Sequence, residues 1–313
     1  IFMPSLQTHE KNLHLRSAAI GSGFSFVISN YGQLWYWNNL RFPFHPKEYI
    51  DDNLPFFVSV VANGHLILLD ECGDVWCSFL QGNSIKLKQH ESLSNIRSIH
   101  VDSSNNDPHS VFYALDFEGT VWKATFDSKF KIENIPLLDY FSVGPSYSSG
   151  IDITGKVWTW KNTRKLIQIS VNQALATYPE KESIKILTKD GKIWKYFIED
   201  ELLERMFSQF DNLPPFVCMN VSGQHSIAID ENGEAWGWGF NSSGELGLVN
   251  TSFIWNPTKI PDIPLLHSTV CGQGRSILIG QDGELMILKN GLKRIKEVPQ
   301  VFIRKSTAKS ARK

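Results

Sequence analysis

The chain has 313 residues, and its 31 Lys and Arg against 32 Asp and Glu give a formal net charge of −1 at pH 7. A charge this close to zero argues against a protein that coats DNA or an anionic membrane, because such proteins need a strong basic field. Hydrophobic residues make up 42% of the chain and charged residues 20%, which excludes wholesale disorder. No apolar run approaches ~18 residues, so we expect no membrane-spanning helix.

Most of the ten tryptophans recur in a repeated segment. Each segment is a turn ending in Gly, followed by a variable residue, an aliphatic residue or Ala, and then Trp, or Met in the last repeat. Successive glycines are 41, 46, 36, 36, 42 and 50 residues apart. A period in this range is typical of a repeat architecture. In chain order the segments are Gly32-Gln33-Leu34-Trp35, Gly73-Asp74-Val75-Trp76, Gly119-Thr120-Val121-Trp122, Gly155-Lys156-Val157-Trp158, Gly191-Lys192-Ile193-Trp194, Gly233-Glu234-Ala235-Trp236 and Gly283-Glu284-Leu285-Met286.

Each repeat has the same internal order of elements. A short apolar run predicts a strand buried on both faces, and a four-residue turn follows it. In four repeats the turn opens with Asp, whose side chain can cap it, while the closing Gly can adopt a positive φ. The next strand carries the Trp, which we expect to pack between repeats, and a Pro-containing connection leads onward. The four capping residues are Asp70, Asp116, Asp152 and Asp230.

A strand pair with flanking strands every ~42 residues, without a helical period, is typical of a β-propeller blade. We therefore predict an all-β, seven-bladed β-propeller over residues 1–303; the alternative, a β-solenoid, has shorter rungs without a hairpin at every turn. Strands near Leu13–Ala19 and Val298–Ile303 are expected to share one sheet and close the ring. The expected blades span residues 17–50, 51–95, 96–136, 137–170, 171–215, 216–264 and 265–303, followed by a basic flexible tail at 304–313.

The sixth repeat indicates the kind of propeller. Residues 221–248 read V-S-G-Q-H-S-I-A-I-D-E-N-G-E-A-W-G-W-G-F-N-S-S-G-E-L-G-L. This run resembles a repeat of the regulator of chromosome condensation family, which reads G-x-x-H-[ST], an apolar strand, G-x-[VA]-[WY], then W-G-x-N-x-x-G-x-L-G. The chain contains neither a Trp-Asp nor a Gly-Gly dipeptide, which disfavours WD and kelch blades. The other six repeats keep only parts of the pattern.

The resemblance implies a propeller that binds a small GTPase of the Ran or Rab type and promotes guanine-nucleotide exchange. In the family's Ran exchange factor, acidic and histidine residues in the loops that precede the apolar strands face the GTPase. These loops recur once per blade on one rim, where side chains are free to specialise. For His225, a structural hydrogen bond is the alternative role. We predict a partner-binding set of Phe24, His65, Asp107, His109, Tyr147, Gln224, His225 and Arg275.

The chain also departs from the exchange factor. Most positions equivalent to Asp107 are not acidic, and the short stretch between Trp122 and Ile135-Pro136 leaves no room for the exchange factor's inserted β-wedge. We find no G-x-S-x-G or H-E-x-x-H motif and no zinc-ligand spacing. We therefore predict no catalytic residue, no metal, no cofactor and no small-molecule substrate, so any exchange activity would come from binding alone.

Basic residues keep two other functions open. They gather at Lys156–Lys165 and Lys181–Lys195, and again in the tail at Arg304–Lys313. Such stretches are often solvated surface, but they can also bind nucleic acid, an acidic partner or an anionic surface. The alternatives to GTPase binding are therefore a chromatin or nucleic-acid adaptor and a scaffold propeller without GTPase contact.

Cysteine usage bears on the compartment. The four cysteines form no C-x-x-C pair, which predicts reduced thiols in an intracellular protein, cytoplasmic or nuclear. The opening Ile1-Phe2-Met3 lacks a signal-peptide pattern. Compact chains of this family also occur among bacterial effectors that act on host GTPases, which would place the protein in the host cytoplasm.

Overall fold

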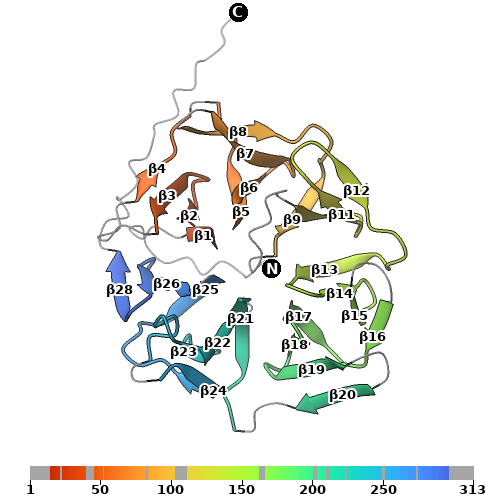
Figure 1. Ribbon diagram of the computed structural model, residues 1–313, viewed down its shortest axis with the longest axis vertical. Helices are drawn as coiled ribbons and strands as arrows, with labels where there is room; N and C mark the ends of the chain where they lie inside the picture. Colours follow the sequence, from red (N-terminus) through yellow and green to blue (C-terminus); the bar gives the residue numbers. More distant parts are fainter. Residues whose placement is uncertain are drawn as a thin grey trace, which may run out of the picture.

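Seven four-stranded antiparallel sheets stand around a central axis (Figure 1), so the predicted seven-bladed β-propeller is confirmed. Within each sheet the strands follow one another in chain order, with the first strand near the axis and the fourth at the rim. The described residues contain no helix long and apolar enough to cross a lipid bilayer. The computed structural model describes residues 15–21, 23–39, 46–51, 53–81, 84–102, 111–161, 166–199, 203–208, 212–222, 224–248, 251–272 and 274–295.

The strands of each blade are short, as a propeller requires. Blades 1 to 3 are β1 Leu15–Ile20, β2 Phe24–Ser29, β3 Leu34–Asn38, β4 Lys47–Glu48; β5 Phe57–Asn63, β6 His65–Asp70, β7 Val75–Gln81, β8 Ser84–Gln89; and β9 Ile96–His100, β10 Phe112–Asp116, β11 Val121–Ala124, β12 Lys129–Lys131. Blades 4 and 5 are β13 Leu138–Val143, β14 Ser148–Asp152, β15 Val157–Trp160, β16 Leu166–Ile169; and β17 Ala174–Pro179, β18 Ser183–Thr188, β19 Ile193–Glu199, β20 Leu203–Ser208. Blades 6 and 7 are β21 Phe216–Ser222, β22 His225–Asp230, β23 Ala235–Phe240, β24 Phe253–Lys259; and β25 Leu266–Gly272, β26 Arg275–Gly280, β27 Leu285–Leu288, β28 Leu292–Ile295.

The repeated Asp holds the turn between the second and third strands, as predicted. In blade 6, Asp230 Oδ1 accepts the backbone N–H groups of Asn232 and Glu234, both at 2.9 Å. Its Oδ2 accepts the indole N–H of Trp236 at 2.9 Å. Blades 2, 3 and 4 repeat these bonds, with indole–carboxylate distances of 2.7–2.9 Å. The turn glycine, Gly233 in this blade, has a φ of +84°, which a side chain would strain.

The tryptophans pack between blades, again as predicted. Among the described residues, each junction between neighbouring blades is filled by its own cluster of buried apolar side chains. Trp76, for example, packs on a cluster shared by blades 1 and 2, and Trp236 on one shared by blades 5 and 6. Met286, which replaces Trp in the last repeat, is fully buried between blades 6 and 7. Because the buried apolar side chains at each junction come from two neighbouring blades, the hydrophobic core extends around the whole ring.

Ring closure by a sheet that both chain ends share stays a prediction, because residues 298–303 lie outside the described residues. Among the described residues, β1 belongs to the sheet of β2–β4, and β28 is the fourth strand of blade 7. Blades 1 and 7 also meet through apolar packing, in which Leu15, Val27 and Trp37 of blade 1 contact Ile277 and Ile287 of blade 7.

Candidate functional site

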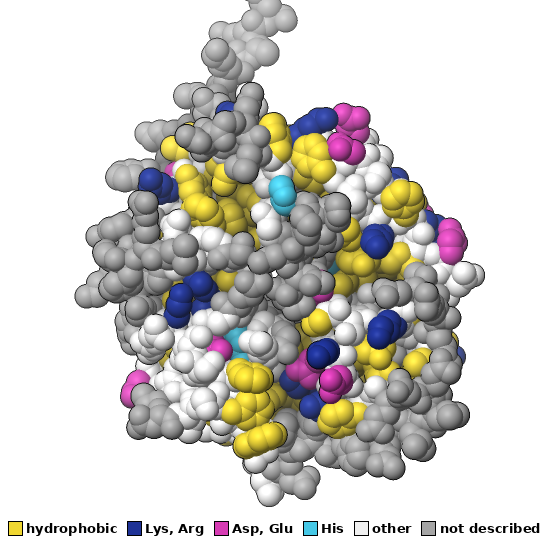
Figure 2. All heavy atoms as spheres, in the orientation of Figure 1, with side chains coloured by type: hydrophobic (Ala, Val, Ile, Leu, Met, Phe, Trp, Pro, Cys, Tyr) yellow, Lys and Arg dark blue, Asp and Glu magenta, His cyan; other side chains and the backbone are white. Residues whose placement is uncertain are grey.

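The loops between the first and second strands of the blades share one face of the ring, which we call the inner-loop face. Phe24, His65, His225 and Arg275 each occupy the first position of a second strand, in β2, β6, β22 and β26. Tyr147 directly precedes β14, and Gln224 directly precedes β22. Asp107 and His109 lie outside the described residues. Figure 2 shows basic and acidic side chains side by side over β17 and β18.

Four of the predicted residues keep surface that a partner could reach. Phe24, His65 and Tyr147 are half-buried, and Gln224 is exposed. The Phe24 ring lies 6.1 Å from the ring of Tyr36, and Lys161 Nζ lies 5.7 Å from the centre of the Tyr147 ring. These side chains are therefore partly positioned by neighbours without being enclosed.

His225 holds blades 6 and 7 together. It is 1% exposed, with Nδ1 3.0 Å from Ser222 Oγ and Nε2 2.8 Å from Ser276 Oγ. Burial, with the charge of Lys185 as a second cause, lowers the pKa of His225 to about 4, so the ring is neutral at pH 7. This geometry matches the structural alternative for His225 and leaves the side chain unavailable to a partner.

Arg275 is likewise committed inside the protein. It is 7% exposed, and its Nη1 donates to the carbonyl oxygen of Asn39 at 3.3 Å, across the junction between blades 7 and 1. The Asn39 amide in turn donates to Gly21 O at 3.0 Å and accepts from Ser25 Oγ at 2.7 Å. Arg275 therefore reinforces ring closure, and the sequence-based expectation of a partner-facing charge is not met in this conformation.

Lys185 is a further residue whose position differs from the expected one. The sequence places it in an exposed basic stretch, but it is 5% exposed. Its Nζ lies 2.5 Å from Glu180 Oε1 and donates to Ser226 Oγ of blade 6 at 2.8 Å. Burial lowers its pKa, and Glu180 opposes that effect. Nearby, Lys192 pairs with Asp190 at 3.0 Å. The basic surface of blade 5 is therefore smaller than its lysine count suggests.

A pocket of about 450 Å³ opens on the inner-loop face between blades 3 and 4. The aromatic rings of Tyr113, Tyr147 and Trp160 line it, together with Asp102 and Lys123. Only Tyr147 was singled out from the sequence. Tyr113 and Trp160 come from β10 and β15, so their meeting depends on how two blades pack, which no local motif reveals.

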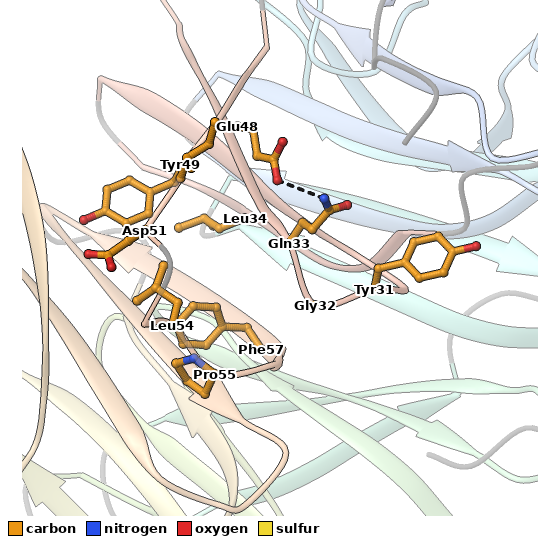
Figure 3. A pocket seen from close by; sticks show the side chains of 11 residues that line it. Tyr31, Gly32, Gln33, Leu34, Glu48, Tyr49, Asp51, Leu54, Pro55 and Phe57 are labelled. Carbon is orange, nitrogen blue, oxygen red and sulfur yellow. Dashed lines mark hydrogen bonds between the residues drawn. The ribbon is translucent and has the colours of Figure 1, made fainter. Parts of the chain in front are cut away.

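A second pocket, of about 150 Å³, lies by the β2–β3 turn (Figure 3). Gln33 Nε2 donates to Glu48 Oε1 at 2.9 Å, while Tyr49 and Asp51 lie beyond Leu34. No sequence motif predicts this pocket. Its small size and internal hydrogen bond make it the weaker candidate.

Of the four cysteines, Cys77 and Cys271 are buried, Cys218 is half-buried and Cys72 is exposed. No group of three or more His, Cys, Asp or Glu side chains among them is arranged to hold a metal ion. Burial raises the pKa of Cys77 and Cys271 to about 12 and that of Cys218 to about 11, so these thiols are protonated at pH 7.

The fold and the repeat define a class of protein, a seven-bladed propeller in which an Asp anchors the turn of four blades. Family models of the regulator of chromosome condensation (RCC1) repeat match residues 216–245 and 232–279. Blade 6 and the adjoining part of blade 7 therefore match RCC1 repeats.

Curated relatives match the chain over a limited length. The mitochondrial RCC1 domain-containing protein RUG3 of Arabidopsis thaliana is 27% identical over 79 residues, which are 25% of this chain and 18% of the relative. The ultraviolet-B receptor UVR8 of the same plant is 25% identical over 123 residues, 38% of this chain and 25% of the receptor. The chain therefore matches a quarter or less of the length of these relatives.

Solved structures are similar over most of the chain. Human WBSCR16 has a TM-score of 0.68 at 13% identity, covering 87% of this chain and 88% of that one. A crystal structure of yeast RCC1 (Prp20) with Kap60 gives 0.66 at 14% identity, covering 87% and 80%. At such low identity these similarities establish the fold alone.

Proposed function

We propose that the chain is a protein-binding propeller whose inner-loop face receives a small GTPase of the Ran or Rab type. The observation that carries the proposal is the pocket between blades 3 and 4, which opens on the face where the family resemblance leads us to expect the GTPase. Aromatic side chains in partly enclosed pockets dominate protein interfaces. Tyr147 and Tyr113 provide such an anchor point for one large apolar side chain of the partner, whereas Trp160 is buried in the core behind the pocket wall.

Charged groups at the same pocket orient the partner. Asp102 and Lys123 both line it and carry opposite charges. Complementary charges of this kind steer association and fix register more than they add affinity. Exchange would follow from holding the GTPase in its nucleotide-free form. Because a small GTPase of this type is an intracellular protein, the proposal also implies that the chain acts in the cytoplasm or nucleus.

A pulldown against a panel of small GTPases, each nucleotide-free and GDP-bound, tests the proposal. Tyr147→Ser should weaken binding of the nucleotide-free form at least about 10-fold, a loss of about 1.4 kcal/mol. Ile153→Ser is the matched control, because Ile153 is 70% exposed in the same blade but lies in the turn at the other end of β14. If no GTPase binds, or if Tyr147→Ser binds at full strength, the proposal fails.

The nucleic-acid alternative has less support. It needs a broad basic surface, whereas Lys185 is buried and Lys192 is paired. Lys156 and Lys189 are exposed and could still contact phosphates. Salt-sensitive binding of duplex DNA that Lys156→Ala and Lys189→Ala abolish would favour this alternative.

A further inference from the structure

The pocket between blades 1 and 2 lies on the face of the ring opposite the inner-loop face. Its walls come from the β2–β3 turn, from β4 and from the connection that leads into β5. In a sheet of four antiparallel strands, the turn after the second strand and the exit from the fourth lie at one end, and the loop after the first strand lies at the other. The pocket is therefore separate from the surface proposed to bind a GTPase.

Two carboxylates give the pocket a negative charge. Glu48 is half-buried and Asp51 is exposed, and the described lining includes no Lys or Arg. Among the described residues, no Lys or Arg forms an ion pair with either carboxylate. The exposed Glu71 adds a third negative charge alongside, since its backbone N–H donates to Phe56 O at 3.0 Å. Arg16 lies over the Phe56 ring, 5.2 Å from its centre, and does not line the pocket.

Both carboxylates are held in place by hydrogen bonds that use one oxygen each. Glu48 Oε1 accepts from Gln33 Nε2 at 2.9 Å, and Gln33 Oε1 accepts from the Ser29 hydroxyl at 3.3 Å. Asp51 Oδ1 accepts from the backbone N–H of Asn53 at 3.1 Å. The second oxygen of each carboxylate has no hydrogen-bond partner among the described residues. Each can therefore accept a charge-assisted hydrogen bond from a cationic ligand.

The rest of the pocket is apolar. In Figure 3, Gln33 and Glu48 lie on one side, and Leu54, Pro55 and Phe57 lie on the other. Its volume of about 150 Å³ is well below the roughly 300–1,000 Å³ of sites for drug-sized ligands. Lys and Arg side chains pack an apolar stem on apolar surface while the charged head stays polar. An apolar wall that ends in two carboxylates fits one such side chain.

The rim of the pocket points to a protein as the source of that side chain. Tyr31 and Ile50 line the pocket and are 59% and 66% exposed. A free amine would fill the pocket but would leave both of these side chains in water. A polypeptide segment also covers them with the neighbours of its basic residue, and this combination of a central anchor and a covered rim is typical of protein interfaces.

We propose that this pocket binds one Lys or Arg side chain from a basic segment of a partner protein. The ammonium or guanidinium group pairs with Glu48 and Asp51, and the stem lies against Leu54. Ion pairs that are partly exposed contribute little each, so the affinity is modest and falls with added salt. Because the site and the inner-loop face lie on opposite sides of the ring, the chain can hold this segment and a GTPase at the same time.

Phage-displayed random peptides test the proposal, selected on the wild-type chain and counter-selected on the double variant Glu48→Gln, Asp51→Asn. These substitutions remove both charges but keep the oxygens that accept from Gln33 and Asn53. We expect the selected peptides to carry Lys or Arg flanked by apolar residues. In fluorescence anisotropy, the double variant should bind such a peptide at least about 5-fold more weakly than the wild-type chain. Raising the salt from about 50 to about 500 mM should weaken wild-type binding.

Glu118→Gln is the matched control, because it removes an exposed carboxylate from the β10–β11 turn of blade 3 on the same face. It should bind the peptide as the wild-type chain does, and melting followed by circular dichroism should be the same for all variants. Selected peptides without a basic residue would overturn the proposal, and so would equal binding to the wild-type chain and the double variant. If acetyl-lysine amide competes as strongly as the whole peptide, the pocket is a site for a free amine and not for a protein segment.

Discussion

Asp152 offers the sharpest test of how the repeated carboxylate holds each blade. Its Oδ1 accepts the backbone N–H of Thr154 at 2.8 Å, that of Lys156 at 3.0 Å and the Thr154 hydroxyl at 2.6 Å. Its Oδ2 accepts the indole N–H of Trp158 at 2.7 Å. Burial disfavours the charge, but these donors outweigh it and lower the pKa of Asp152 from 3.8 to about 2.

The pKa difference between the unfolded and folded states sets the loss of stability expected for Asp152→Asn. A pKa that falls from 3.8 to about 2 on folding corresponds, at about 1.4 kcal/mol per pKa unit, to a stabilisation of the fold by about 2.5 kcal/mol at pH 7. The substitution keeps the shape but removes the charge and turns an N–H₂ group toward donors. We expect the free energy of unfolding to fall by about 2–3 kcal/mol at pH 7.

The pH dependence of that loss is the discriminating result. Because the folded-state pKa is below the unfolded one, the contribution is complete above about pH 5, falls to roughly half at pH 3 and vanishes below about pH 2. Urea unfolding of both proteins at pH 7, 4 and 3 should show the difference shrinking as the pH falls. Asp282→Asn, at an exposed turn position without an indole partner, should change stability by less than about 0.5 kcal/mol. An Asp152→Asn loss that is equal at pH 7 and pH 3 would refute the reasoning.

Three further stability predictions concern single positions, and urea unfolding at pH 7 measures each. Ser29 stands where four other blades have Asp, and the Nε1 atom of Trp35 is buried with no partner among the described residues. Ser29→Asp should therefore raise the free energy of unfolding by about 1 kcal/mol. A loss of stability would contradict this. Gly119 and Gly155 share a φ near +88°, but only at Gly119 would an added Cβ lie 2.9 Å from a backbone oxygen. Gly119→Ala should therefore lower the free energy of unfolding by about 1–3 kcal/mol more than Gly155→Ala does. Equal losses would count against this prediction. Lys185→Met should lower the free energy of unfolding by about 3 kcal/mol, because it leaves the Glu180 carboxylate buried without its cation. Adding Glu180→Gln should recover most of that loss. If Lys185→Met leaves stability unchanged, the ion pair is exposed in solution.

The sequence was sufficient for the fold because its strongest pattern is local. An Asp, a Gly three residues later and a Trp six residues later form one turn, in which Asp230, Gly233 and Trp236 satisfy one another. Four complete copies of that turn and three partial ones, at a steady spacing, leave few architectures other than a ring. Ring closure stays a prediction, because residues 298–303 lie outside the described residues and the pattern does not show where in each repeat a blade begins. Here β1 opens its own sheet.

The candidate site was predicted only in part, because its side chains are sorted by contacts between blades. His225 and Arg275 occupy the same strand position as Phe24 and His65, yet the first two are buried by partners from the next blade. Lys185 is buried in the same manner by Ser226 of the next blade, apart from its ion pair with Glu180 of its own blade. These pairings link residues about 40 to 240 positions apart, and no spacing rule connects them.

Hydrogen–deuterium exchange on a complex with the tightest-binding nucleotide-free GTPase tests the central claim most directly, since it reports which face is covered. We expect protection in the inner-loop segments around Phe24, His65 and Tyr147, with the β14–β15 turn at Ile153 unchanged. Protection confined to the opposite turns or to β24, with the Tyr147 segment exchanging as in the free chain, would contradict a GTPase site on the inner-loop face.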